Sequence, residues 1–303
     1  MMKNLGIDIG GSFIKFGIVE DNNLIHNTEI PNNAINLSEF ELVVNNTIKD
    51  LTKRFSPESI GIGFPGTINS SGDIISAPNM TYWESGNIID VFNKLTDLPV
   101  YYQNDAYLAG YAEAKLNEIS EFYFVTLGTG IGSVLIKDKV LITTASGSSG
   151  ELGHIIISFQ AKGDDYRTGI FENYFNANEF VLKAKSDLKN FPNSMLRSLD
   201  SFSVREISDA VNIGDDLAII NFMEMGKILG IGLSSAANLT GIPIFVIGGG
   251  ISQVNNLLFE TATSEMKKRV IPELKDKVSI IKSKLHNEAG ILGAALYAKE
   301  NMK

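Results

Sequence analysis

The chain has 303 residues, a net charge of −9 and no cysteine. This composition excludes disulfides and thiolate metal sites, and it argues against nucleic acid as a partner. The length suffices for two domains. No membrane partner is expected, because no window approaches the roughly 18 unbroken apolar residues of a membrane span. Without a basic and apolar leader before Leu5, we expect a cytoplasmic protein.

The first apolar run, residues 5–9, leads into a pair of glycines before apolar alternation resumes. The pattern predicts a strand, a tight turn and a second strand. Adjacent glycines let backbone N–H groups cradle an anion such as phosphate, here at Gly10 and Gly11. Asp8 could hold Mg²⁺ through its water shell, and Lys15 could pair with a phosphate charge. A plain hairpin with a Gly-Gly turn is the alternative.

A second copy of this pattern lies more than a hundred residues further on. Residues 122–127 form an apolar run that breaks at Gly128, Thr129 and Gly130, and another apolar run follows. A repeat this long indicates two similarly built lobes rather than a solenoid. Two anion-cradling turns that face each other across a cleft would suit a nucleoside triphosphate.

Between the two copies the chain alternates predicted helices and strands. Ser38 and Glu41 stand at capping-box spacing ahead of a helical pattern. Residues 98–103 predict a strand that delivers Asn104 and Asp105 to the start of an Ala-rich helix. An Asp at such a junction is most often an N-cap, which is the alternative to a chemical role.

The second half of the chain contains two further stretches that suit ligands. A loop of small residues ends at Glu151 and His154, where a close ligand contact is expected, although a lone His is more often structural. A buried-type strand, residues 244–247, ends in three glycines. They would allow close approach to the adenosine end of a nucleotide, unless they form a plain turn: Gly248, Gly249 and Gly250.

Together these stretches resemble the ROK family of sugar kinases and repressors, within the actin-like ATPase and hexokinase superfamily. Ser12 stands where the family usually has Thr, and Glu172 falls where it places a further sugar-contacting Glu. The other motifs follow one another in family order, at residues 8–15, 61–66, 78–83, 104–106, 127–132 and 151–154.

The resemblance implies an α/β fold of two lobes, the actin-like ATPase (ribonuclease H-like) fold with a duplicated core. A small α/β lobe, residues 1–119 plus 286–303, would carry the first phosphate motif, the sugar loops and the catalytic Asp. A large α/β lobe, residues 120–285, would carry the second phosphate loop, the sugar signature and the adenosine site. The family is usually dimeric, so we expect a homodimer.

The resemblance also implies an ATP- and Mg²⁺-dependent kinase that phosphorylates a sugar 6-hydroxyl, with Asp105 as general base. It is glucokinase-like, with glucose, N-acetylmannosamine or a β-glucoside as candidate substrates. The implied sugar contacts are Asn79, Asn104, Asp105, Glu151, His154 and Glu172. The implied nucleotide contacts are Asp8, Gly10, Gly11, Ser12, Lys15, Gly128, Thr129, Gly130, Gly248, Gly249 and Gly250.

One departure from the family pattern concerns zinc. Family members commonly bind zinc through the His of the sugar signature and three Cys, but the corresponding segment, residues 162–170, has no cysteine. We therefore expect no zinc, a His154 that contacts sugar directly, and a loop ordered by other contacts.

Two other functions remain open. A sugar-responsive transcriptional regulator of the same family would carry a DNA-binding helix-turn-helix, for which little room precedes Leu5. A catalytically inactive sugar-binding protein is the other possibility, although Asp8, Asp105 and Glu151 are all present.

Overall fold

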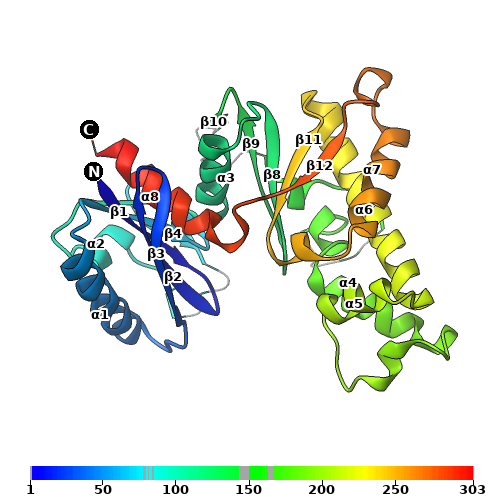
Figure 1. Cartoon of the computed structure of the whole chain (residues 1–303), viewed down its shortest axis with the longest axis horizontal. Coiled ribbons are helices and arrows are strands. Elements are labelled where there is room, and N and C mark those ends of the chain that lie inside the picture. Colours follow the sequence, from blue (N-terminus) through cyan, green and yellow to red (C-terminus); the bar gives the residue numbers. More distant parts are fainter. Residues whose placement is uncertain are drawn as a thin grey trace. The chain divides into compact units, whose positions relative to one another are not determined.

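The computed structural model describes residues 2–77, 80, 82–83, 85–142, 150–160, 162 and 167–302. The chain divides into two compact units (Figure 1). Unit 1 comprises residues 1–118 and 287–303, and unit 2 comprises residues 119–286. Each unit combines one five-stranded sheet with helices, so the predicted α/β class is confirmed.

The sheet of unit 1 is mixed. Its first three strands form an antiparallel meander, and the other two extend it in parallel from β1. In spatial order the strands are β3 (Asn23–Pro31), β2 (Phe13–Glu20), β1 (Lys3–Ile9), β4 (Ser59–Phe64) and β7 (Val100–Asn104). A short hairpin, β5 (Thr67–Ile68) with β6 (Ile74–Ser76), follows β4. Asp8 lies opposite Lys15 on β2 and opposite Gly63 on β4.

The described helices of unit 1 cover its sheet. They are α1 (Leu37–Phe55), α2 (Ile88–Phe92), α3 (Asp105–Leu116) and α8 (Ala289–Asn301). Buried side chains of α1, among them Phe40 and Ile48, share a core with Leu5 and Ile7 of β1. In Figure 1, α8 lies along β1 and β4, and it also packs on α3.

The start of α1 differs from the predicted start. Its N-cap is Asn36, whose Oδ1 accepts the N–H of Glu39 at 2.9 Å. The Glu39 carboxylate in turn accepts the N–H of Ile35 at 3.1 Å. The capping box predicted at Ser38 and Glu41 is therefore wrong, because both residues already lie inside the helix.

Unit 2 repeats the sheet topology of unit 1. Its strands are β10 (Val140–Leu141), β9 (Ile131–Lys137), β8 (Phe122–Leu127), β11 (Ile244–Gly248) and β12 (Ser279–Lys282), in that spatial order. β8 and β9 are antiparallel like β1 and β2, while β11 and β12 extend the sheet in parallel like β4 and β7. The duplicated core predicted from the sequence repeat is confirmed.

The described α-helices of unit 2 are α4 (Ala177–Asp187), α5 (Val204–Asn212), α6 (Asp216–Thr240) and α7 (Leu257–Arg269). A capping box of Ser203 and Glu206 starts α5. Among the described helices, α6 is long and apolar enough to cross a membrane by length and composition. Some 61% of the 18-residue window that meets this test is buried inside the structure, however, where α6 packs on α7 and the core of unit 2.

The alternating Gly-Ile pattern of β1 and β4 follows from what covers each face of the sheet. Leu5 and Ile7 point into the core shared with α1, whereas Gly6 and Gly61 meet the backbone of α8. A Cβ atom at Gly6 or Gly61 would overlap a carbonyl oxygen of α8. Glycine in these strands therefore permits the close approach of a helix to the sheet.

Gly293 of α8 offers a test of this packing. In a helix, Gly→Ala ordinarily stabilises by up to about 1 kcal/mol. Here a Cβ atom would overlap the carbonyl oxygen of Leu108 in α3, so we expect Gly293→Ala to destabilise the protein by about 2 kcal/mol or more. Denaturant unfolding measures the change. The exposed helix position Ser264 is the control, where Ala should be neutral or slightly stabilising. Equal stability of Gly293→Ala and the wild type would refute the packing argument.

Candidate functional site

Two carboxylates of unit 1 lie on either side of β4. Asp8 belongs to β1, and Asp105 starts α3 directly after β7. A Cβ atom at Gly63 of β4 would lie 3.5 Å from Asp105 Cα and 3.6 Å from Asp8 Oδ1. Asp8 also packs on the first turn of α8, because a Cβ atom at Gly290 would lie 2.6 Å from Asp8 Oδ2. The two residues therefore flank Gly63, close enough for the charge of Asp8 to act on Asp105.

The electrostatics of this pair differ from those of an exposed Asp. Burial, and next the neighbouring Asp8 carboxylate, raise the pKa of Asp105 from 3.8 to about 7, although the N–H of Ala106 donates to Oδ1 at 2.8 Å and opposes the shift. Burial also raises the pKa of Asp8, against the opposing charge of Lys15. A carboxyl group with a pKa near 7 is suited to proton transfer at neutral pH.

The helix-capping role that the sequence left open for Asp105 belongs to Asn104. Its Oδ1 accepts the N–H of Tyr107 at 3.1 Å, and its Nδ2 donates to the carbonyl oxygen of Gly66 at 3.1 Å. Asn104 therefore fixes the start of α3 and ties it to the loop after β4. The Asp105 carboxylate is not the cap.

The turn between β1 and β2 is tight, as predicted. The N–H of Gly10 donates to the carbonyl oxygen of Phe13 at 2.9 Å, and Gly11 and Ser12 are exposed. Asn32, just after β3, donates from Nδ2 to the carbonyl oxygen of Gly10 at 2.7 Å. The sequence analysis did not single out Asn32, whose only signal is its place next to Pro31 at a strand end. Of the predicted sugar contacts, Asn79 lies outside the described residues.

In unit 2 the turns after β8 and β11 lie side by side. Gly249 has a φ of +80°, which favours glycine, and a Cβ atom there would lie 2.5 Å from the carbonyl oxygen of Leu127. A Cβ atom at Gly128 or Gly250 would meet no described atom within 4 Å, and Thr129 is exposed. This edge of the sheet therefore has room beside its backbone for a ligand.

Glu172 joins two of the predicted motifs. Its Oε2 accepts the N–H of Ile131 at 2.7 Å, directly after the second glycine turn. The same oxygen would lie 2.5 Å from a Cβ atom at Gly130 and 3.4 Å from one at Gly153. Glu172 thus holds the second glycine turn next to the segment that carries Glu151.

Glu151 and His154 lie exposed on a segment that buried Ser133 holds in place. The Ser133 hydroxyl donates to the carbonyl oxygen of Gly150 and accepts the N–H of Leu152 at 2.8 Å. Burial raises the pKa of Glu151; the neighbouring His154 lowers it and Glu172 raises it. The structure therefore brings Glu151, His154 and Glu172 together in unit 2. The sequence analysis missed Ser133, whose partner lies 17 residues away.

Asn173 contacts residues 162–170, the segment that corresponds to the family's zinc loop. Its Nδ2 donates to the carbonyl oxygens of Lys162 at 2.8 Å and of Arg167 at 2.7 Å. Lys162 also forms an ion pair with Glu179 of α4. These contacts order the ends of the segment. Within the described part of the chain, no group of three His, Cys, Asp or Glu side chains could hold a metal ion.

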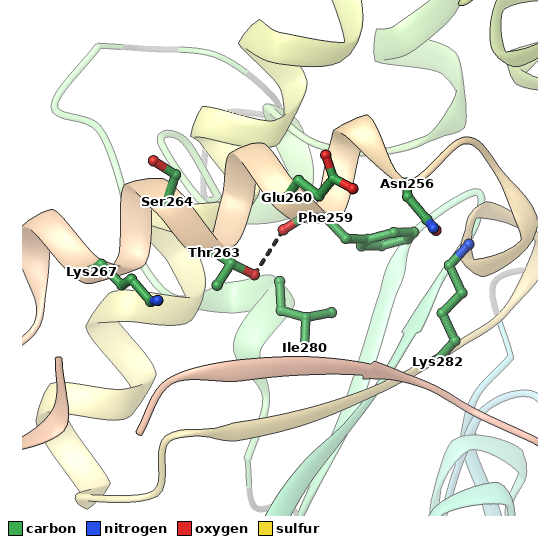
Figure 2. Close-up of a pocket in the computed structure, with 8 residues that line it drawn as sticks. All are labelled: Asn256, Phe259, Glu260, Thr263, Ser264, Lys267, Ile280 and Lys282. Atoms are coloured by element: carbon green, nitrogen blue, oxygen red, sulfur yellow. Dashed lines mark hydrogen bonds between the residues drawn. The ribbon is translucent and has the colours of Figure 1, made fainter. Parts of the chain in front are cut away.

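A separate open pocket of about 670 Å³ lies between α7 and β12 of unit 2 (Figure 2). It contains none of the residues predicted from the sequence. The Thr263 hydroxyl donates to the carbonyl oxygen of Phe259 within α7, and Lys282 donates to the carbonyl oxygen of Val254 at 2.9 Å. Because these polar groups bond to the protein backbone, we assign the pocket no role.

Known proteins match this chain over nearly its whole length. A sequence profile described as the ROK family matches residues 4–301. The glucokinase of Thermotoga maritima is 24% identical over 312 residues, 99% of this chain and 98% of that protein. The xylose repressor of Bacillus spizizenii is 25% identical over 304 residues, 96% of this chain and 75% of the repressor.

A solved structure confirms the predicted fold. The ROK family glucokinase of Streptomyces griseus, in complex with glucose and AMPPNP, matches with a TM-score of 0.84. The match covers 99% of this chain and 100% of that chain at 24% identity. The two-lobed actin-like ATPase fold predicted from the sequence is therefore the fold of this chain.

The raised pKa of Asp105 predicts a stability effect. Its folded-state pKa lies above the unfolded value of 3.8, so wild-type stability should fall as pH rises from about 4 to about 7. We expect Asp105→Asn to raise the free energy of unfolding by roughly 1–3 kcal/mol at pH 8, with a difference that shrinks towards pH 4. Denaturant unfolding at several pH values measures this.

Asp73 of unit 1 is the control, because its replacement by Asn should change the stability at pH 8 in the opposite direction. Hydrogen bonds from Asn69 and Asn87 lower its pKa, so the charged form is favoured in the folded state. Asp73→Asn should therefore destabilise the protein at pH 8. If Asp105→Asn also destabilises at pH 8, the account of the buried carboxylate is incorrect.

Proposed function

Because the chain belongs to the ROK family, we propose that it is an ATP-dependent hexose kinase that phosphorylates a sugar 6-hydroxyl. Full-length similarity to several glucokinases, at 24–26% identity, supports a sugar kinase. The observation that carries the proposal is Asp105, a carboxylate with a pKa near 7 beside a second carboxylate.

In the proposed reaction Asp105 is the general base. Its carboxylate takes the proton of the sugar hydroxyl as that oxygen attacks the γ-phosphorus of ATP. A bond forms between the sugar oxygen and phosphorus, and the bond to the β–γ bridging oxygen breaks, which leaves ADP. Asn104 contributes by fixing the start of α3, on which Asp105 stands.

Asp8 fits the Mg²⁺ that the family implies. Its carboxylate is buried and its negative charge raises the pKa of Asp105, and a cation bound beside it would offset that charge. Asp8 would contact the ion through a water molecule. When bound, Mg²⁺ neutralises negative charge on the phosphates of ATP. Lys15, opposite Asp8 on β2, would pair with a phosphate oxygen.

Each unit offers a glycine turn as a candidate nucleotide contact. In unit 1 the exposed residues Gly11 and Ser12 offer backbone N–H groups next to Gly10. In unit 2 the open space beside Gly128 and Gly250 would accommodate phosphate and adenosine. The remaining contacts predicted from the sequence belong to the same proposal: Thr129, Gly130, Gly248 and Gly249.

The candidate sugar contacts are Glu151 and His154 in unit 2, and Asn79 and Asn104 in unit 1. Glu172 already accepts a backbone N–H through one oxygen, so we assign its other oxygen to the sugar. Polar groups that a sugar must pair allow such a site to reject analogues that lack a hydroxyl. Glucose is the first candidate, followed by N-acetylmannosamine and a β-glucoside. A homodimer in the cytoplasm belongs to the same proposal.

A coupled assay of ADP release with Mg-ATP tests the proposal against glucose, N-acetylmannosamine, N-acetylglucosamine, mannose, fructose and cellobiose. One sugar turning over well above the rest would support the kinase and name its substrate. Sugar binding by thermal shift without ADP release would instead favour a sugar-responsive regulator, a class represented by the xylose repressors among the relatives.

Replacement of the general base should separate chemistry from binding. We expect Asp105→Asn to lower kcat by about 10²–10⁴-fold, because the amide cannot accept the hydroxyl proton, while ATP affinity changes little. Steady-state kinetics and isothermal titration with AMPPNP measure the two effects. Asp73→Asn, on the exposed hairpin of unit 1, should leave turnover unchanged. Near-normal turnover by Asp105→Asn would exclude the assigned role.

The pH dependence should report the same group. Asp105 must be ionised to accept a proton, so kcat/KM for the sugar should fall about tenfold per pH unit below about pH 7 and level off above it. Removing the Asp8 charge in Asp8→Asn should move the midpoint to lower pH, whatever its effect on the maximum rate. A wild-type midpoint near pH 4 would contradict the shifted pKa.

A further inference from the structure

A buried amide in unit 1 connects the first glycine turn to the segment that contains Met80, Tyr82 and Trp83. Asn32 is only 9% exposed. Its Nδ2 donates to the carbonyl oxygen of Gly10 at 2.7 Å, and its Oδ1 accepts the hydroxyl of Tyr82 at 2.6 Å. Its backbone N–H donates to the carbonyl oxygen of Ser12 at 2.9 Å. One residue therefore fixes both ends of the turn and one side chain of the neighbouring segment.

The bond to Gly10 has a consequence for the ligand side of the turn. In a planar trans peptide group the C=O and the following N–H point in opposite directions. The carbonyl of Gly10 and the N–H of Gly11 belong to one such group. When Asn32 holds the Gly10 carbonyl towards the interior, the N–H of exposed Gly11 is directed outward, where an anion can reach it.

The other side of Asn32 rests on a well-anchored segment. Trp83 is 1% exposed and its ring packs on Phe40 and Phe64, with centroids 4.9 Å and 5.2 Å away. The N–H of Trp83 donates to the carbonyl oxygen of Met80 at 2.8 Å. Tyr82 lies between these two anchors. A shift of the segment would therefore pull on the Tyr82 hydroxyl and, through Asn32, on the Gly10 peptide.

We infer that Asn32 is a positioning residue that couples this segment to the phosphate turn. The inference rests on the proposed function, in which the segment belongs to the sugar side and the turn to the nucleotide side. Sugar bound at the segment would hold Tyr82 and Asn32 in place and present the Gly11 N–H to phosphate. Sugar and nucleotide would each tighten the binding of the other.

Removal of the Tyr82 hydroxyl alone is the sharpest test. Tyr82→Phe keeps the ring and deletes the bond to Asn32, and Tyr102→Phe is the matched control, because it deletes a hydroxyl that donates at 3.0 Å to the carbonyl oxygen of Ser70 in the same unit. Isothermal titration measures the affinity for Mg-AMPPNP with and without the sugar that turns over fastest. We expect the sugar to tighten AMPPNP binding about tenfold in the wild type and in Tyr102→Phe, and by twofold or less in Tyr82→Phe.

Two further readouts separate coupling from simple structural loss. Amide hydrogen exchange without ligands should be faster at Gly11 in Asn32→Ala than in the wild type. The double variant Asn32→Ala, Tyr82→Phe should lose no more of the sugar enhancement of AMPPNP binding than Asn32→Ala alone. Equal sugar enhancement in Tyr82→Phe and the wild type, or no enhancement in the wild type, would overturn the inference. Absence of turnover with every sugar would instead overturn the proposed function, while the exchange of Gly11 would still test the role of Asn32.

Discussion

The proposed chemistry depends on the electrostatic interaction between Asp8 and Asp105. Parallel pairing of β1, β4 and β7 brings the two carboxylates to the same end of the sheet, on either side of Gly63 in β4. Neither residue alone would have unusual proton affinity at an exposed strand end. Burial raises both pKa values and the Asp8 charge raises that of Asp105 further, which makes Asp105 a candidate base and Asp8 a candidate cation contact.

The two units share a structural feature at their first glycine turn. Each unit begins with two antiparallel strands joined by a glycine turn, and in each unit one polar side chain from a distant part of the chain fixes that turn. In unit 1 this is Asn32, which accepts from Tyr82 and donates to Gly10. In unit 2 it is Glu172, which accepts the N–H of Ile131. Glycine turns suit phosphates because they lack side chains, so their geometry must come from elsewhere in the fold.

The sequence predicted the features that local pattern determines. Strand, turn and strand around Gly10 and the duplicated core follow from spacing and residue type. The predicted cap of α1 was wrong because Asn36, two residues before Ser38, caps the helix by accepting the N–H of Glu39. The roles of Asn32 and Ser133 could not be predicted, since their partners lie 17 to 50 residues away and an isolated Asn or Ser has no periodic signal. For the predicted site residues the sequence supplied candidates, and the contacts of Asn104 and Glu172 show that some also support the structure.

Direct titration of the Asp105 carboxyl tests the central claim. Carbon NMR of protein labelled at the Asp side chains, with Asp105→Asn to assign the signal, follows the protonation of this one group. We predict a midpoint near pH 7 in the wild type and a lower midpoint in Asp8→Asn. A midpoint near the ordinary value of 3.8, unchanged by Asp8→Asn, would contradict the account, because Asp105 would then be neither desolvated nor coupled to Asp8.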